Sequence, residues 1–168
     1  MDSIEISVAT GPDADLDQLA PLWTAMVDHH RQVAGRDLPV RQSDEAWAMR
    51  RQEYLYWLND GSGLLLTGHT GSGTAGGYAF LRTIASGPTF DFGARRGEVE
   101  SLVVAPAARG MGIGTALLQA SRGELRRLGC AYWSVSVMEA NQGAVHLYER
   151  AGFRPWLREL AAPLDDLA

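Results

Sequence analysis

Apolar and polar residues alternate with different periods along the first part of the chain. Ile4, Ile6 and Val8 alternate with polar neighbours, a period of two that predicts a half-buried first strand. Over residues 15–33 the apolar residues recur at the spacing of one helical face, so we predict a helix there. A loop is expected over 35–42, and the helix-start signal at Ser43 predicts a second helix over 43–58.

The remainder of the chain shows strand patterns separated by turn signals. Two runs, 63–70 and 76–84, flank a Gly- and Ser-rich turn at 70–73 and predict a hairpin, whereas residues 86–97 are irregular. The later elements expected are a strand over 99–105, a helix ending near Leu128, a strand over 131–138, a helix over 141–150 and a last strand from Phe153. The order β-α-α-β-β-β-α-β-α-β and the length of 168 residues favour a single α/β domain spanning 1–168.

Composition and charge exclude several classes of function. The chain is 46% hydrophobic and 21% charged, an ordinary balance for a globular protein. Its net charge of −5 argues against a general nucleic-acid binder and favours a cationic small molecule or peptide amine as substrate. All fifteen basic residues are arginine. Without lysine, Schiff-base chemistry, a lysine nucleophile and a Walker-type phosphate loop are excluded.

The N-terminus and the cysteine usage indicate the compartment. Residues 1–5 lack the basic and apolar regions of a signal peptide, and no apolar run is long enough to span a bilayer, so no membrane partner is expected. Cys130 is the only cysteine, which rules out an intrachain disulfide and is expected to be buried and inert. We therefore expect a cytoplasmic protein.

A glycine-rich turn lies between the predicted strand 99–105 and the helix that follows. It consists of Arg109, Gly110, Met111, Gly112, Ile113, Gly114 and Thr115. Glycines allow a tight turn and leave no Cβ in the way of a ligand. The free N–H groups of the first helical turn and the helix dipole attract an anion, so the turn is suited to a pyrophosphate.

Three explanations of this turn compete. It is a tight turn without a ligand, a dinucleotide-binding turn, or the phosphate loop of a coenzyme A acyltransferase. A tight turn without a ligand is disfavoured, because it would need fewer glycines than this segment contains. The second requires Gly-x-Gly-x-x-Gly, and from Gly110 the last place is occupied by Thr115, so the pattern fails.

Two segments carry a resemblance to a known family. Residues 99–114 are similar to motif A of the GNAT acetyltransferase superfamily, whose (Gln/Arg)-x-x-Gly-x-(Gly/Ala) pattern is matched by Arg109, Gly112 and Gly114. Residues 141–153 resemble the next motif of the family. The resemblance covers about residues 98–154 and implies a mixed, mostly antiparallel twisted sheet flanked by helices. It also implies that acetyl-CoA enters between two splayed central strands.

The resemblance assigns residues to the cofactor. Backbone groups of Leu102, Val103 and Val104 are expected to bind the acetyl and pantetheine arm as an added strand would. The turn from Arg109 to Thr115 is expected to bind the pyrophosphate. Asn141 matches an asparagine that contacts the pantetheine arm, although a plain N-cap is an equal alternative. No metal is implied.

The same resemblance assigns catalytic candidates. Tyr148 matches the tyrosine that protonates the leaving thiolate, and packing at a helix–sheet interface is its alternative role. Glu98 and Glu100 share a parity, so both are expected on one side of their strand. Glu98 lies eleven residues before Arg109, where some family members carry a general base. Either carboxylate can deprotonate the amine directly or through water, attract a cationic substrate, or simply be solvated.

The acceptor site of the family lies between the first two helices and their connection. His29, His30, Trp47 and Tyr54 are therefore candidates for its wall. The two histidines point about 100° apart on a helix, so they are not expected to bind one metal ion together. A role for them as ordinary exposed or partly packed residues remains the alternative.

The function expected from the resemblance is transfer of an acetyl group from acetyl-CoA to a primary amine by direct attack in a ternary complex. The acceptor is an unidentified small molecule or peptide, and a homodimer is possible. Two rivals are a non-catalytic acyl-CoA sensor and a dinucleotide-dependent oxidoreductase.

Overall fold

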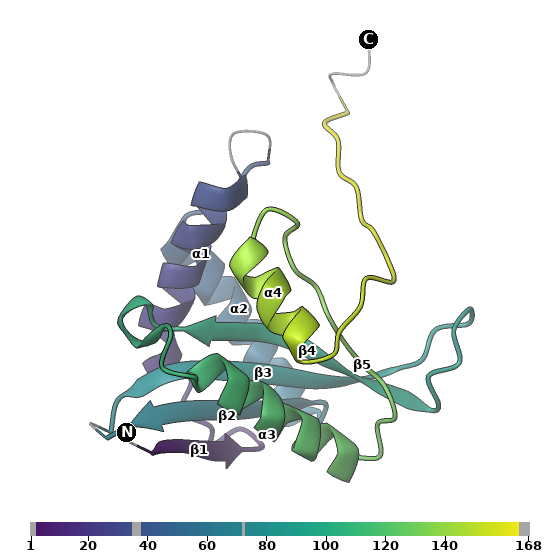
Figure 1. The fold of residues 1–168 in the computed structure, drawn as a ribbon, viewed down its shortest axis with the longest axis horizontal. Coiled ribbons are helices and arrows are strands. Elements are labelled where there is room, and N and C mark those ends of the chain that lie inside the picture. Colours follow the sequence, from purple (N-terminus) through teal and green to yellow (C-terminus); the bar gives the residue numbers. More distant parts are fainter. Residues whose placement is uncertain (1–2, 35–37, 72, 165–168) are drawn as a thin grey trace.

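The computed structural model describes residues 3–34, 38–71 and 73–164 (Figure 1). Parts of the predicted loop 35–42 and of the turn 70–73 lie outside these residues. The elements are β1 (Ile4–Ala9), η1 (Asp17–Leu19), α1 (Ala20–Ala34), α2 (Ser43–Asn59), β2 (Gly63–Thr70), β3 (Ala75–Ala85), β4 (Arg95–Val104), η2 (Pro106–Ala108), α3 (Ile113–Arg127), β5 (Trp133–Val135) and α4 (Gln142–Arg150).

In the described residues, five strands form one sheet in the order β1-β2-β3-β4-β5. The first three pairings are antiparallel, and β4 and β5 run parallel. This confirms the mixed, mostly antiparallel sheet expected from the family resemblance. The consecutive hairpin strands pair with their sequence neighbours, whereas the parallel β5 is reached through the crossover helix α3.

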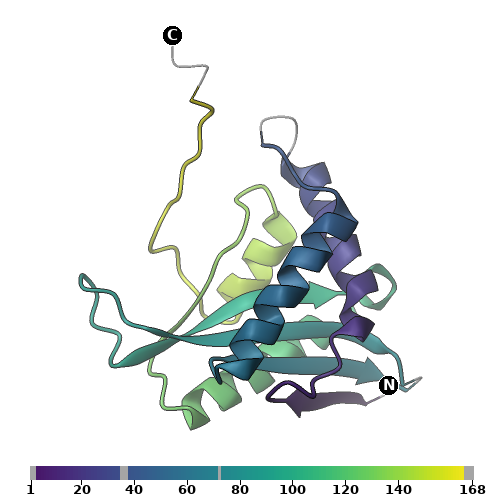
Figure 2. The same cartoon turned by 180° about the vertical axis from the view of Figure 1, so that it is seen from behind.

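Helices cover both faces of the sheet. In Figure 1 α3 and α4 lie in front of the strands, and Figure 2 shows α1 and α2 on the opposite face. Two apolar clusters fill the space between these layers. Ile113 and Leu117 of α3 pack with Leu81 of β3 on one side, and Tyr54 of α2 packs with Phe80 of β3 on the other. The alternation of β3 thus supplies a core to each face.

A β-bulge interrupts the antiparallel pairing of β3 and β4. Leu81 pairs with Val99, and Phe80 pairs with Ser101, so Glu100 is the extra residue on β4. Val99 packs in the cluster on the α3 side, whereas Ser101 faces α2 and accepts a hydrogen bond from Tyr54. The bulge therefore shifts the strand's side-chain alternation by one residue at the centre of the sheet.

The C-terminal part of the chain departs from the sequence-based expectation. The strand predicted over 131–138 is limited to Trp133–Val135, because the chain leaves the sheet there and turns toward α4. The last strand predicted from Phe153 is wrong: within the described residues, 153–164 pair with no strand and run away from the sheet (Figure 1). Pro155 and Pro163 lack the N–H that a ladder requires, and the leucines of this segment are exposed.

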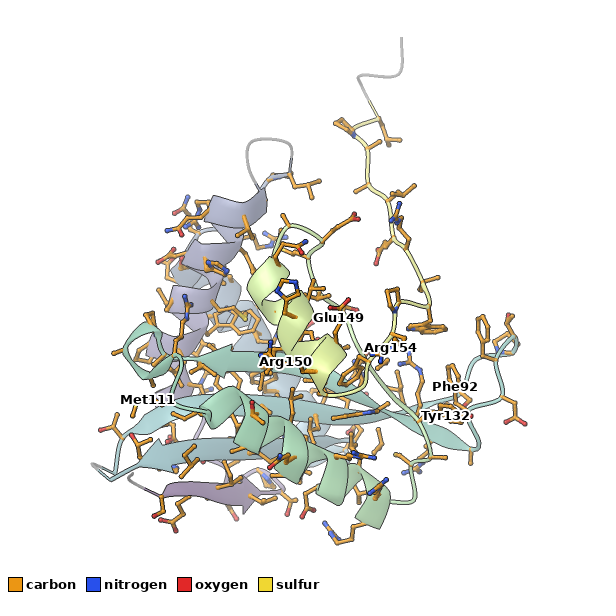
Figure 3. All side chains as sticks on the ribbon, in the orientation of Figure 1. Phe92, Met111, Tyr132, Glu149, Arg150 and Arg154 are labelled. Carbon is orange, nitrogen blue, oxygen red and sulfur yellow. The ribbon has the colours of Figure 1, made fainter. Side chains whose placement is uncertain are left out.

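The C-terminal segment contacts the rest of the molecule through aromatic side chains. Phe153 packs on Trp133 of β5, with ring centroids 4.4 Å apart. The ring of Trp156 lies 5.5 Å from that of Phe92, which is labelled with Tyr132 in Figure 3. Among the described residues, no helix is both long enough and apolar enough to cross a membrane.

Candidate functional site

The pairing of β4 with β5 is short, and the two strands separate beyond it. Register partners are Gly97 with Trp133, Glu98 with Ser134 and Val99 with Val135, and the pairing ends there. From Glu100 to Val104 the edge of β4 borders a cleft of about 1160 Å³ instead of a strand. The walls of the cleft come from α1, Arg50 of α2, the glycine-rich turn, the end of β5 and α4. The splayed sheet therefore presents free backbone N–H and C=O groups to a ligand.

The glycine-rich turn closes one end of the cleft. Gly110 and Gly112 adopt φ values of 78° and 89°, in the left-handed region that disfavours residues with a Cβ. Gly112 is the N-cap of α3, and no side chain caps the N–H groups of the first turn. A Cβ on Gly114 would lie 3.3 Å from a methyl group of Leu147, so the third glycine permits close packing of α3 against α4. Local conformation and packing each explain part of the glycine pattern.

Most residues predicted to bind the cofactor border this cleft. They are Leu102, Val103, Val104, Arg109, Gly110, Gly112, Ile113, Gly114, Thr115, Asn141 and Tyr148. Met111 does not border it, because its side chain is half exposed on the outer side of the turn (Figure 3). The helix α3 adds roughly half a positive charge at this end, which favours an anion beside the turn.

Asn141 and Tyr148 lie on the opposite wall. The Oδ1 atom of Asn141 accepts a hydrogen bond from the backbone N–H of Ala144 at 3.3 Å, so Asn141 is the N-cap of α4. Its cap role and its position at the cleft coexist. Tyr148 is 8% exposed, and burial raises its pKa to about 12. The phenol therefore keeps its proton throughout the neutral range, as an acid requires.

Glu98 and Glu100 lie on the same side of β4, as predicted, and share an arginine. Glu100 forms ion pairs with Arg50 of α2 at 2.5 Å and with Arg82 of β3 at 3.3 Å. Glu98 lies 3.8 Å from Arg82 and 3.9 Å from Arg96. Glu100 borders the cleft, whereas Glu98 lies where β4 and β5 are still paired. Of the two carboxylates, Glu100 is the one placed beside a ligand in the cleft.

Glutamine in place of Glu98 is expected to raise the melting temperature at neutral pH. Burial, followed by the charge of Glu100, raises the pKa of Glu98 above its usual value. The stabilising contribution of Glu98 is therefore present below its pKa in the unfolded state and is lost as the pH rises through its pKa in the folded state. Glutamine resembles the protonated form and keeps that contribution at neutral pH. Thermal unfolding of Glu98→Gln and wild type between about pH 3 and pH 8 should show a gain that vanishes at the acid end. The variant Glu5→Gln, at an exposed position of β1, is the control, and a gain independent of pH would contradict the explanation.

Two of the four residues predicted for the acceptor wall border the cleft. His29 and His30 of α1 border the cleft, and burial, followed by the charge of His29, lowers the pKa of His30. Trp47 and Tyr54 do not border it. Tyr54 is completely buried beneath the sheet, stacked on Phe80 at 3.9 Å, and Trp47 packs against it in the same core. Both face α1 and β3 because that side of α2 covers the sheet.

Several residues that border the cleft were not predicted from the sequence, among them Trp23 of α1 and Arg50 of α2. Arg50 pairs with Glu100, and its guanidinium lies over the ring of Trp23. Trp23 was missed because it fits the apolar face of its helix and was interpreted as a core residue. Arg50 was missed because no sequence motif surrounds it. The role of Arg50 becomes visible only in the folded structure, where its guanidinium lies opposite Glu100.

Phenylalanine in place of Tyr54 is expected to reduce the free energy of unfolding by about 1–3 kcal/mol, because a buried polar group loses its partner. The hydroxyl of Tyr54 donates a hydrogen bond to Ser101 Oγ at 2.7 Å, next to the bulge, and Ser101 is 6% exposed. Urea denaturation is the measurement. Tyr56→Phe on the same helix is the control, since Tyr56 is 65% exposed and its loss should change little. Equal stability of the two variants would contradict the role of this hydrogen bond.

Metal ligands do not gather in the described part of the chain. No group of three or more His, Cys, Asp or Glu residues is placed to hold a metal ion there. Cys130 is buried, and burial raises the pKa of its thiol.

The structure thus has a mixed sheet that splays beside a glycine-rich helix start. The sequence matches the family described as Acetyltransferase (GNAT) family over residues 25–153. Since this match covers well over half of the chain, the protein belongs to the GNAT family.

Relatives and solved structures are similar over different extents. The chain is 35% identical over 141 residues to a mycothiol acetyltransferase from Propionibacterium freudenreichii subsp. shermanii, which covers 84% of this chain but 40% of the relative. The chain therefore spans less than half the length of that relative. A GCN5-related N-acetyltransferase from Ralstonia eutropha JMP134 superposes with a TM-score of 0.72 at 26% identity, covering 97% of this chain and 99% of the other.

A further solved structure shows the fold with a coenzyme bound. It is an aminoglycoside N-acetyltransferase in complex with CoA, with a TM-score of 0.72, 16% identity and coverage of 97% of this chain and 95% of the other. At this identity the similarity establishes the shared fold.

Proposed function

We propose that the protein transfers the acetyl group of acetyl-CoA to a primary amine by direct attack in a ternary complex. The observation that carries the proposal is the free edge of β4 from Glu100 to Val104, which runs into the glycine-rich turn at the start of α3. An edge of backbone donors and acceptors that leads to an anion site fits a ligand with an amide-containing arm and a pyrophosphate. Acetyl-CoA has both.

The glycine-rich turn would hold the pyrophosphate. Gly110 has no atom within 4 Å of the position where a Cβ would stand, so its backbone is open to a ligand. The N–H groups that follow Gly112 have no side-chain cap. The pantetheine arm would then pair with β4 in the space that β5 leaves, with Asn141 across the cleft.

The chemistry needs a base for the amine and an acid for the leaving sulfur. In the proposed reaction, Glu100 accepts a proton from the ammonium directly or through water, and Glu98 adds negative charge on the same side. The free amine attacks the thioester carbonyl, the C–S bond breaks, and the thiolate takes a proton from Tyr148. The nitrogen, which became positively charged on attack, loses its extra proton to water, and Tyr148 regains a proton from water. Tyr148 borders the cleft in its protonated form, which supports this role.

The relative named mycothiol acetyltransferase suggests one acceptor to test first. We include the des-acetyl form of mycothiol among small amines and short peptides, because the relative shares 35% identity with most of this chain. The fold does not specify the acceptor, since one fold carries many sites.

Thiol release from acetyl-CoA across a panel of amines tests the proposal. Release that depends on the amine, with the acetylated amine detected by mass spectrometry, is the expected result. Binding of CoA without release for any amine would favour an acyl-CoA sensor. Stabilisation by NAD or NADP but not by CoA would favour an oxidoreductase and overturn the proposal.

A further inference from the structure

The charge of the cleft differs from that of the whole protein. The net charge is −5, yet among the described residues that border the cleft the charged side chains of Arg, Lys, Asp and Glu are Arg50, Arg109, Arg150 and Glu100. Arg150, labelled in Figure 3, lies in the last turn of α4, and Arg109 is the first residue of the glycine-rich turn. The two therefore lie at the pyrophosphate end. The acidic excess of the chain lies outside the cleft, so it gives no reason to expect a polycationic acceptor.

Arg50 and Glu100 form the charged group at the end of the cleft opposite the proposed pyrophosphate site. An Nη1 atom of Arg50 donates to a carboxylate oxygen of Glu100 at 2.5 Å, and its Nε lies 3.3 Å from Glu53. The guanidinium lies over the ring of Trp23, 5.1 Å from its centroid. Within the described part of the chain, the printed contacts of Arg50 use its Nη1 and Nε atoms and leave Nη2 without an acceptor. The side chain is 22% exposed and borders the cleft, so the guanidinium has a donor to offer a ligand there.

Glu100 presents a negative charge directly beside that positive one. It is the bulge residue of β4, next to the open edge that we assign to the acetyl and pantetheine arm. Its carboxylate is held by Arg50 and by Arg82, and 17% of its side chain remains exposed. A ligand in this corner therefore meets a fixed carboxylate and a fixed guanidinium side by side.

A fixed pair of opposite charges selects a ligand with complementary groups in the same spacing. An ammonium satisfies Glu100, and an oxygen acceptor on the neighbouring carbon satisfies the free donor of Arg50. Simple alkylamines leave that donor unsatisfied, which is costly in a partly desolvated site. Polycationic amines meet only one carboxylate and up to three guanidinium groups in the cleft.

Resting on the proposed function, we infer that the acceptor is an α-amino carbonyl compound: an amino acid, an aminoacyl amide or a peptide N-terminus. Glu100 binds and deprotonates its amino group, and Arg50 binds the adjacent carbonyl or carboxylate oxygen. Arg50 is thus the residue that determines specificity for the acceptor.

Matched acceptors test this inference in the wild-type protein. Phenylalanine amide and 2-phenylethylamine differ by the carboxamide, and kcat/KM is compared per concentration of free amine to remove the effect of amine basicity. We expect phenylalanine amide to be favoured by about tenfold or more, the effect of a charge-assisted hydrogen bond. The peptide Phe-Gly-Gly distinguishes a peptide acceptor from a small molecule, and spermine represents polycations. Equal or better rates with 2-phenylethylamine or spermine overturn the inference.

Variants of Arg50 assign the selectivity to this side chain. Arg50→Met should bring the ratio of the two kcat/KM values close to one while the KM for acetyl-CoA stays unchanged. Arg50→Lys keeps the charge but not the planar fork, so it should retain part of the ratio even if Arg50→Met fails to fold. Arg51→Met is the control on the same helix, since Arg51 pairs with Asp17 and does not border the cleft.

The outcomes separate the two proposals. A ratio unchanged in both Arg50 variants, or lowered equally in Arg51→Met, overturns the inference alone. Thiol release from no amine in the panel overturns the proposed function, and this inference with it.

Discussion

Tyr148→Phe is expected to lower kcat about a hundredfold, the contribution of a positioned general acid. The phenol borders the cleft and is 8% exposed, so phenylalanine replaces it with the same packing on Phe153. Since the pKa of Tyr148 is raised to about 12, its proton is present over the whole working range. The loss should therefore be nearly constant between about pH 6 and pH 10. Thiol-release kinetics with a saturating amine is the measurement.

Two controls separate acid catalysis from structural damage in this variant. Tyr132→Phe removes a phenol that is 56% exposed, just before β5, and should leave kcat unchanged. The affinity of Tyr148→Phe for CoA should equal that of the wild type. A Tyr148→Phe enzyme with wild-type kcat at every pH would exclude the acid role.

Gly112→Val is expected to weaken CoA binding by about tenfold or more for each hydrogen bond that is lost. Gly112 has a φ of 89°, a conformation that a β-branched residue does not tolerate, so the turn must change and move its N–H groups. Space is not the obstacle, because a Cβ there would lie 3.6 Å from Ile4. Isothermal titration calorimetry with CoA measures the effect.

The matched control for Gly112→Val is Gly123→Ala in the middle of α3. No atom lies within 4 Å of its Cβ position, so CoA affinity should be unchanged and the helix slightly stabilised. Pantetheine, which lacks the pyrophosphate, should bind Gly112→Val and wild type similarly. If Gly112→Val bound CoA as tightly as the wild type, the proposal that this turn binds the pyrophosphate would be wrong.

The elements that sequence predicted best are those with local causes. One example is the segment on either side of Gly112, which comprises β4, the glycine-rich turn and α3. Its elements follow from the spacing of apolar residues and from backbone conformation within a few residues. The core strands 63–70 and 76–84 were clear for the same reason, since apolar runs and turn residues mark them. The part of the cleft that we propose for the cofactor was predictable because one continuous segment builds much of it.

What could not be predicted depends on contacts between distant segments. The expected acceptor residue Tyr54 is buried, because α2 turns that side toward β3. Arg50, four residues earlier, reaches the cleft by pairing with Glu100, and no period in the sequence indicates such a pair. The strand expected from Phe153 failed for the same reason: the local pattern allowed a strand, but no partner strand lies beside it in the described chain.

The bulge at Glu100 makes this residue surplus to the sheet. With Glu100 deleted, Val99 and Ser101 would still pair with Leu81 and Phe80, and the ladder would become regular with every other side chain on its present face. The architecture therefore does not require a residue at this point. β4 is one residue longer than its ladder needs, and that additional residue is the carboxylate nearest the open edge.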